Sequence, residues 1–403
     1  MKDCSSNYFD QFDWPVMMSQ NAWPDDTATF YDIKKYHSIL SPDYPEFLDR
    51  YIKLPLLQRL KGVGLLCGTD WTKLYKNRFY YSRLDHSVGV ALIIWHFTHD
   101  KKQTLAGLFH DASTPVFSHV SDFRKGDALT QTATEAGNEG LLKNDADLAE
   151  LLQQDGLTVK DICDYHIYPV ADNEIPQLSA DRLEYMFPSG MALDGTWDLP
   201  SIERAYNDII VLKNEDGIDE IGFKTLEIAE DYCRRFCMTG HILQLNENKL
   251  TLHLLGQIMN LAVEQGVLKE EDFMTRTERE IMTALDAALP ALRQAQEPQI
   301  EGPQTKVLHP VVPEPVEGPS LYQLYHTFRT MTRIEHTDSP LNPKEYFCVS
   351  LNVKQRYIDP LCLDTQGKPA RLSQLSPFAH KIIQDFKSYK DTQYGCVKLV
   401  PAT

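Results

Sequence analysis

Four residues with metal-binding side chains stand beside apolar, helix-like segments that lie far apart in the chain. They are His86, the dipeptide His110-Asp111, and Asp181. Two imidazoles and two carboxylates form a mixed nitrogen and oxygen ligand set that suits a divalent cation. Adjacent side chains on a helix point about 100° apart, so His110 and Asp111 reach one ion only near a helix end or kink. The residues ASTP that follow them favour such an irregularity.

A structural alternative to this metal site must be weighed. An isolated histidine on an apolar helix face is usually a core residue with a satisfied hydrogen bond. A single His-Asp pair also means little, because the chain has another, His99-Asp100, in a polar segment typical of a helix end. The ordered set of one histidine, one His-Asp pair and one aspartate, each beside an apolar pattern, favours the metal site.

Four longer segments carry a resemblance to a known family. They are LQRLKGVG (57–64), SRLDHSVGV (82–90), AGLFHDASTPVFSHV (106–120) and ADRLEYMF (180–187). Together they resemble the HD-domain metal-dependent phosphohydrolases, and most closely the branch of deoxynucleoside triphosphate triphosphohydrolases. Fainter similarity continues to about residue 285. The resemblance implies a mainly α fold, an HD-domain helical bundle.

The resemblance also implies roles for individual residues. His86, His110, Asp111 and Asp181 would hold one divalent metal ion, which could be Mn, Fe, Ni, Zn or Mg. Asp111 would also orient or deprotonate a water molecule for attack on phosphorus. Arg83 matches a family arginine that contacts substrate phosphate, the alternative being a salt bridge at a helix start.

Other positions are matched less completely. Tyr185 matches a pocket tyrosine beside the sugar, or is simply a core aromatic. Thr114 stands where the triphosphohydrolases carry a histidine, and Thr134-Glu135 is the best match to their His-Glu pair. The HD nucleoside monophosphatases instead carry a glutamate at the position of Thr114. A threonine hydroxyl is far too weak an acid to protonate a leaving group near pH 7. His119 does match and is the candidate acid. The catalytic candidates are therefore Asp111, His119 and Glu135, which are fewer catalytic residues than the triphosphohydrolases carry.

Composition limits the class of protein. The chain has 403 residues, 42% hydrophobic and 10% aromatic, which is typical of a globular protein. No apolar run approaches the ~20 residues of a membrane span. The net charge of −17 argues against general nucleic-acid binding but not against a small phosphorylated substrate. The eight cysteines form no CxxC pair, Cys233 and Cys237 are spaced as buried thiols, and a cytoplasmic location is expected.

The pattern along the chain predicts four parts. Residues 1–45 read as an irregular N-terminal arm, 46–296 as the helical HD domain, 297–319 as a Pro/Glu/Gly-rich linker or insertion, and 320–403 as a small α+β subdomain. Within them we expect a short strand or hairpin at 65–75, a helix capped by Ser179, a loop at 189–200 and almost only helices at 200–289. Strands in 345–363 and a helix at 375–389 complete the prediction.

These observations predict a metal-dependent phosphohydrolase that acts on a nucleotide or a related phosphate ester. The alternative is a nucleotide-binding regulatory HD protein with little or no turnover. The metal, the nucleotide and the choice between mono- and triphosphate cleavage stay open. The oligomeric state stays open as well, and a homo-oligomer is possible because the branch that the sequence resembles often forms symmetric oligomers.

Overall fold

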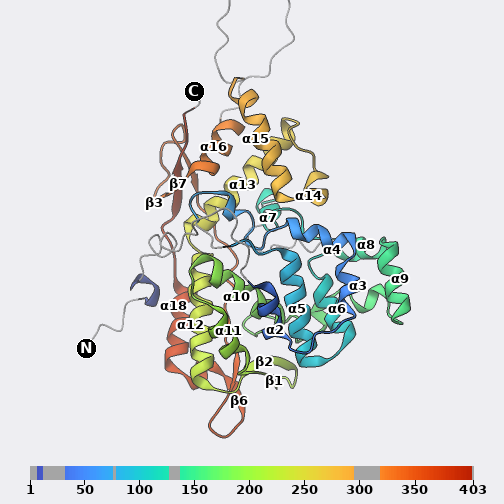
Figure 1. Ribbon diagram of the computed structural model, residues 1–403. Helices are drawn as coiled ribbons and strands as arrows, with labels where there is room; N and C mark the ends of the chain where they lie inside the picture. Colours follow the sequence, from blue (N-terminus) through green and yellow to red (C-terminus); the bar gives the residue numbers. More distant parts are fainter. Residues whose placement is uncertain (1–6, 12–31, 76–78, 127–136, 295–317, 402–403) are drawn as a thin grey trace, which may run out of the picture.

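The computed structural model describes residues 7–11, 32–75, 79–126, 137–294 and 318–401. The fold is mainly α with a small α+β part, as predicted (Figure 1). At its centre, α5 (Arg83–Thr98) and α6 (Lys101–Phe109) pack against each other, and α10 (Ala180–Leu193) packs on α5. Most of α5 is buried, which is typical of a core helix. These three helices carry the residues of interest.

Capping residues explain where α5 and α6 begin and end. The Ser82 side chain accepts a hydrogen bond from the Asp85 backbone N–H, and the Asp85 carboxylate accepts one in return, which makes a capping box. His99 ends α5 in a left-handed conformation, and Asp100 caps the start of α6. The second His-Asp pair of the sequence is therefore a helix boundary, as predicted.

The remaining helices surround this centre. They are α2 (Ile33–Leu40), α3 (Leu48–Ile52), α4 (Pro55–Gln58), α7 (Val120–Arg124), α8 (Asn138–Lys143), α9 (Ala146–Gln154), α11 (Leu199–Tyr206), α12 (Leu226–Ile242), α13 (Asn246–Glu264), α14 (Asp272–Thr275), α15 (Glu278–Gln294), α16 (Leu321–Thr330), α17 (Leu372–Leu375) and α18 (Pro377–Ser388). Ser179 caps α10 as predicted, since its side chain accepts from the Arg182 backbone N–H.

The C-terminal part supplies strands to two small sheets, and one of these also includes two strands from the preceding helical region. Strands β1 (Ile209–Lys213), β2 (Asp219–Phe223), β5 (Leu361–Leu363) and β6 (Pro369–Arg371) form one sheet in that order. Strands β3 (Glu335–Thr337), β7 (Tyr394–Lys398) and β4 (Tyr346–Val349) form the other. The C-terminal part runs along one flank of the molecule, where α18 packs on α12 (Figure 1). The division into four parts stays a prediction, and 295–317 lie outside the described residues.

Several local predictions need correction. Residues 33–40 are helical within the arm expected to be irregular, because Asp32 caps them and Tyr36 and Leu40 are buried. Residues 65–75 form turns and a short 3₁₀ helix, since Cys67 and Gly68 adopt left-handed conformations that an extended strand cannot include. The expected loop at 189–200 is helical up to Leu193.

The region expected to be almost only helical contains the β1–β2 hairpin. Its strand β1 is rich in β-branched residues, and Gly217, with a φ of 75°, allows the connecting turn. This hairpin gains a partner when β5 pairs with β2 in parallel, so a long-range contact stabilises it. The predicted strands around β4 and β5 and the predicted helix at α18 are confirmed.

Among the described residues, five cysteines are free thiols and two form a disulfide. Cys233 and Cys237 are buried free thiols, as predicted, whereas Cys348 and Cys396 form a disulfide between β4 and β7. Disulfides persist mainly in oxidising compartments, so this pair weighs against the reducing surroundings that we expected. The cytoplasmic location stays a prediction. Among the described residues, no helix has the length and apolar character needed to cross a membrane.

Candidate metal centre

The four predicted ligands line one cavity of about 190 Å³. His86 lies in the first turn of α5 and Asp181 in the first turn of α10, while His110 and Asp111 follow directly after α6. Adjacent side chains on a regular helix would point apart, but α6 ends at Phe109, just before His110 and Asp111. The backbone then forms a turn in which the Thr114 N–H donates to the Asp111 carbonyl. The tertiary structure thus brings all four side chains together.

The separations between their ligand atoms match a metal site. Nε2 of His86 lies 3.1 Å from Oδ1 of Asp181, and Nε2 of His110 lies 3.7 Å from the same oxygen. Oδ2 of Asp111 lies 3.8 Å from Nε2 of His86 and 3.6 Å from Nε2 of His110. Ligand bonds of about 2.1 Å place neighbouring ligand atoms roughly 3.0–3.5 Å apart. A divalent ion therefore fits among the ligand atoms of His86, His110 and Asp181, which all lie within 4.8 Å of one another, whereas Asp111 lies outside this group and has to shift to join them.

A buried carboxylate orients His86. Oε2 of Glu184 accepts a hydrogen bond from Nδ1 of His86, and its Oε1 accepts from the hydroxyls of Tyr81 at 2.6 Å and Tyr36 at 3.0 Å. Because Nδ1 donates to Glu184, Nε2 can carry the lone pair that a metal requires. A Cβ at Gly89 would lie 2.5 Å from Oε1 of Glu184, so only glycine leaves room for this carboxylate.

The main chain orients His110. Its Nδ1 lies 2.7 Å from the carbonyl oxygen of Gly107, to which it donates, so its Nε2 is also free to bind a metal. Nη2 of Arg59 donates to the carbonyls of Ala112 at 3.0 Å and Thr114 at 2.7 Å, and holds the turn that carries Asp111. Both imidazoles thus present the same nitrogen to the cavity.

Asp111 and Arg83 form a buried ion pair at the edge of the ligand set. Nη1 of Arg83 donates to Oδ2 of Asp111 at 2.6 Å, and the Thr114 hydroxyl donates to Oδ1 at 2.7 Å. Burial by itself raises the pKa of Asp111, but Arg83 and the two imidazoles hold it well below its usual range. Asp111 therefore stays ionised and is a very weak base.

Strained backbone surrounds Arg83. Its Nε donates to the Ser118 hydroxyl at 2.6 Å. Ser118, Phe117 and Cys67 have φ values of 49°, 61° and 55°, a left-handed conformation that costs free energy in residues other than glycine. Such strain often accompanies functional sites, because the surrounding structure must hold it in place.

The remaining predicted residues differ in their positions. His119 and Tyr185 line the cavity, and the Tyr185 hydroxyl is buried without a hydrogen-bond partner among the described residues. Burial lowers the pKa of His119, although Asp122 accepts a hydrogen bond from its Nδ1 at 3.0 Å. Thr114 is 1% exposed and donates to Asp111, so it does not line the cavity. Thr134 and Glu135 lie outside the described residues.

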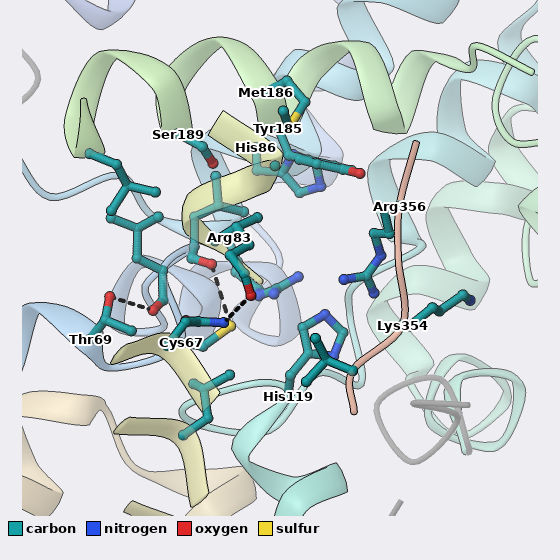
Figure 2. Close-up of a pocket in the computed structure, with 18 of the residues that line it drawn as sticks. Cys67, Thr69, Arg83, His86, His119, Tyr185, Met186, Ser189, Lys354 and Arg356 are labelled. Atoms are coloured by element: carbon teal, nitrogen blue, oxygen red, sulfur yellow. Dashed lines mark hydrogen bonds between the residues drawn. The ribbon is translucent and has the colours of Figure 1, made fainter. Parts of the chain in front are cut away.

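Sequence reasoning missed four polar residues that also line the cavity. They are Gln244 and Asn248 around the start of α13, and Lys354 and Arg356 in the segment between β4 and β5. Figure 2 shows Arg83 and Cys67 on one side of the cavity and this C-terminal segment on the other. No local signal marked the segment, because its alternating residues predict only a strand.

Comparison with known proteins gives distant relatives. No family model matches the chain. A metal-dependent phosphohydrolase of Cordyceps militaris, cns2, is 24% identical over 246 residues, which span 59% of this chain and 68% of the relative. The chain is related to a metal-dependent phosphohydrolase. The YdhJ protein of Bacillus subtilis is 25% identical over 246 residues, 60% of this chain and 71% of YdhJ.

Two solved structures share the fold. A phosphohydrolase from Bacteroides thetaiotaomicron matches with a TM-score of 0.51 and 13% identity, over 87% of this chain and 95% of that structure. A hypothetical protein from Aquifex aeolicus matches with a TM-score of 0.55 and 14% identity, over 88% and 93%. At such low identity these matches show the fold alone.

Proposed function

We propose that this protein is an HD-type metal-dependent phosphohydrolase acting on a nucleotide or a related phosphate ester. One observation carries the proposal: two imidazoles, each oriented through Nδ1, present Nε2 to two carboxylates in one cavity. The similarity to cns2, a metal-dependent phosphohydrolase of Cordyceps militaris, supports it. The closer assignment to the triphosphohydrolase branch rests on the sequence resemblance.

His86, His110, Asp111 and Asp181 would hold the metal ion. Their donor set suits Mn, Fe, Ni or Zn better than Mg, because imidazole is a poor ligand for magnesium. When bound, such an ion polarises a phosphoryl oxygen and makes water a better nucleophile near neutral pH. Asp111 acts as a ligand and orienting group rather than as a base, since Arg83 keeps its pKa low.

The side chains around the ligands supply the remaining functions. Arg83 is held by Asp111 and Ser118 and offers its guanidinium to a phosphate at the metal centre. Nδ1 of His119 donates to Asp122, so Nε2 carries a proton for the leaving group only when the ring is an imidazolium. Tyr185 has a buried hydroxyl without a partner among the described residues, which suits a polar group of the substrate.

One observation favours the second candidate, a regulatory protein with little turnover. Thr114 stands where the family that the sequence resembles carries an ionisable residue, and its hydroxyl donates a hydrogen bond to Asp111. Burial also lowers the pKa of His119, so only a small fraction of this acid is protonated at neutral pH. A missing general acid typically costs ~10²–10⁴-fold in rate but leaves the metal chemistry in place.

The test combines metal analysis with a nucleotide panel. The purified protein is analysed for bound metal, and phosphate or polyphosphate release is measured with mono-, di- and triphosphates in the presence of Mn²⁺, Fe²⁺, Ni²⁺ or Mg²⁺. We expect one equivalent of metal and metal-dependent release, both lost in His110→Ala. A metallated, folded protein that binds nucleotides but releases nothing would support the regulatory candidate instead.

A further inference from the structure

The segment between β4 and β5 forms a wall of the cavity. It connects the two sheets, since β4 belongs to one and β5 to the other. Three of its residues, Val353, Lys354 and Arg356, line the cavity. Figure 2 shows the Arg356 guanidinium pointing inward, between His119 and the Tyr185 hydroxyl, whereas Lys354 points away. A cation from the C-terminal part therefore faces the candidate metal centre.

Side-chain and main-chain contacts hold this segment in place. Nε2 of Gln355 donates to the Lys387 carbonyl at 3.3 Å and to Oε1 of Gln244 at 3.1 Å. Ile358 is fully buried, and the Asp359 N–H donates to the Pro176 carbonyl at 2.8 Å. These contacts lie one residue before Arg356 and two and three residues after it. Its backbone is thus fixed from both sides although it lies in no helix or strand.

The charge of the cavity differs from that of the whole protein. The chain carries a net charge of −17, yet the described residues that line this cavity include Arg83, Arg356 and the outward-pointing Lys354 beside two carboxylates, Asp111 and Asp181. The carboxylates are engaged with Arg83 and the imidazoles. A bound divalent ion would add further positive charge. The cavity therefore suits a substrate with more negative charge than a single phosphate ester carries.

We propose that Arg356 binds a second phosphoryl group of the substrate, next to the one at the metal centre. The planar guanidinium can donate two parallel hydrogen bonds to phosphate oxygens. His119 and Tyr185 lie beside it, so the second phosphoryl group would pass through the space that these three side chains surround. The preferred substrates then contain at least two linked phosphates, and the C-terminal part completes the binding site.

This inference rests on the proposed function, but binding tests it separately. We compare Arg356→Gln and Arg356→Lys with Lys368→Gln, which removes the same charge from an exposed turn outside the cavity. Titration calorimetry on the metallated full chain measures the affinity for inorganic pyrophosphate and for orthophosphate. Loss of a charge-assisted bidentate contact should weaken pyrophosphate binding about 10- to 100-fold in Arg356→Gln. Arg356→Lys should recover part of it.

The outcomes separate the inference from the function. Orthophosphate binding, metal content and the melting temperature should change little in Arg356→Gln, and Lys368→Gln should match the wild type. Pyrophosphate binding that depends on Arg356, without hydrolysis of any nucleotide, would keep this inference and refute the proposed function. Equal pyrophosphate affinity in Arg356→Gln and wild type, or none in either, would overturn the inference. Hydrolysis of monophosphates alone, unaffected by Arg356→Gln, would do the same.

Discussion

The carboxylate of Glu184 should control metal affinity without touching the metal. It accepts from Nδ1 of His86 and from the hydroxyls of Tyr36 and Tyr81, and it is fully buried. Glu184→Gln keeps the shape and one acceptor oxygen but removes the charge that stabilises a proton on Nδ1. The imidazole can then place its proton on Nε2 instead, and that tautomer cannot bind the ion through Nε2.

The expected loss follows from the number of contacts that survive. Changing a residue that orients a metal ligand typically lowers metal affinity 10- to 100-fold, or about 1.4–2.7 kcal/mol. We expect the lower end for Glu184→Gln, because the amide still fills the space and can still accept one hydrogen bond. Tyr81→Phe removes one of the three donors and leaves the charge, so it should change metal affinity by less than Glu184→Gln does.

The assay is competition between the protein and a chelator for Mn²⁺ at constant pH, with thermal unfolding as a check on folding. Glu220→Gln is the matched control, because Glu220 is an equally buried carboxylate that binds Arg371 and does not line the cavity. It should lower stability and leave metal affinity unchanged. A folded Glu184→Gln protein with wild-type affinity would show that Glu184 does not select the tautomer of His86.

Three further predictions test other parts of the structure. Gly89→Ala should weaken metal binding in the same chelator assay, because the new Cβ displaces the Glu184 carboxylate; unchanged affinity would contradict the packing described here. Thr114→His should not raise phosphate release, because the buried site next to Asp111 has no room for an imidazole and no access to the cavity; a gain in rate would mean that this position reaches the substrate. His336, whose pKa its partners Asp391 and Glu247 raise to about 10, should stabilise the fold fully below about pH 6.5 and lose this effect as the pH rises through 10. His336→Gln should therefore lower the melting temperature more at pH 6 than at pH 10.5, and an equal loss at both would show that the charge of His336 does not matter.

The sequence by itself predicted the ligand set and the helices that carry it. His86 and Asp181 follow good capping residues, Ser82 and Ser179, and the pair His110-Asp111 stands where an apolar run ends. Such signals are local, because capping and helical periodicity depend on residues within one or two turns. The mainly α fold with a small α+β part follows from the same local patterns.

Only the tertiary structure decided how these ligands are oriented and what faces them. Glu184 meets His86 because α10 packs on α5, and Tyr36 reaches the same carboxylate from α2. The segment carrying Arg356 reaches the cavity because β4 and β5 belong to two different sheets, one of which includes the β1–β2 hairpin. These contacts join residues far apart in the chain, and they depend on the packing of whole elements rather than on any spacing along it.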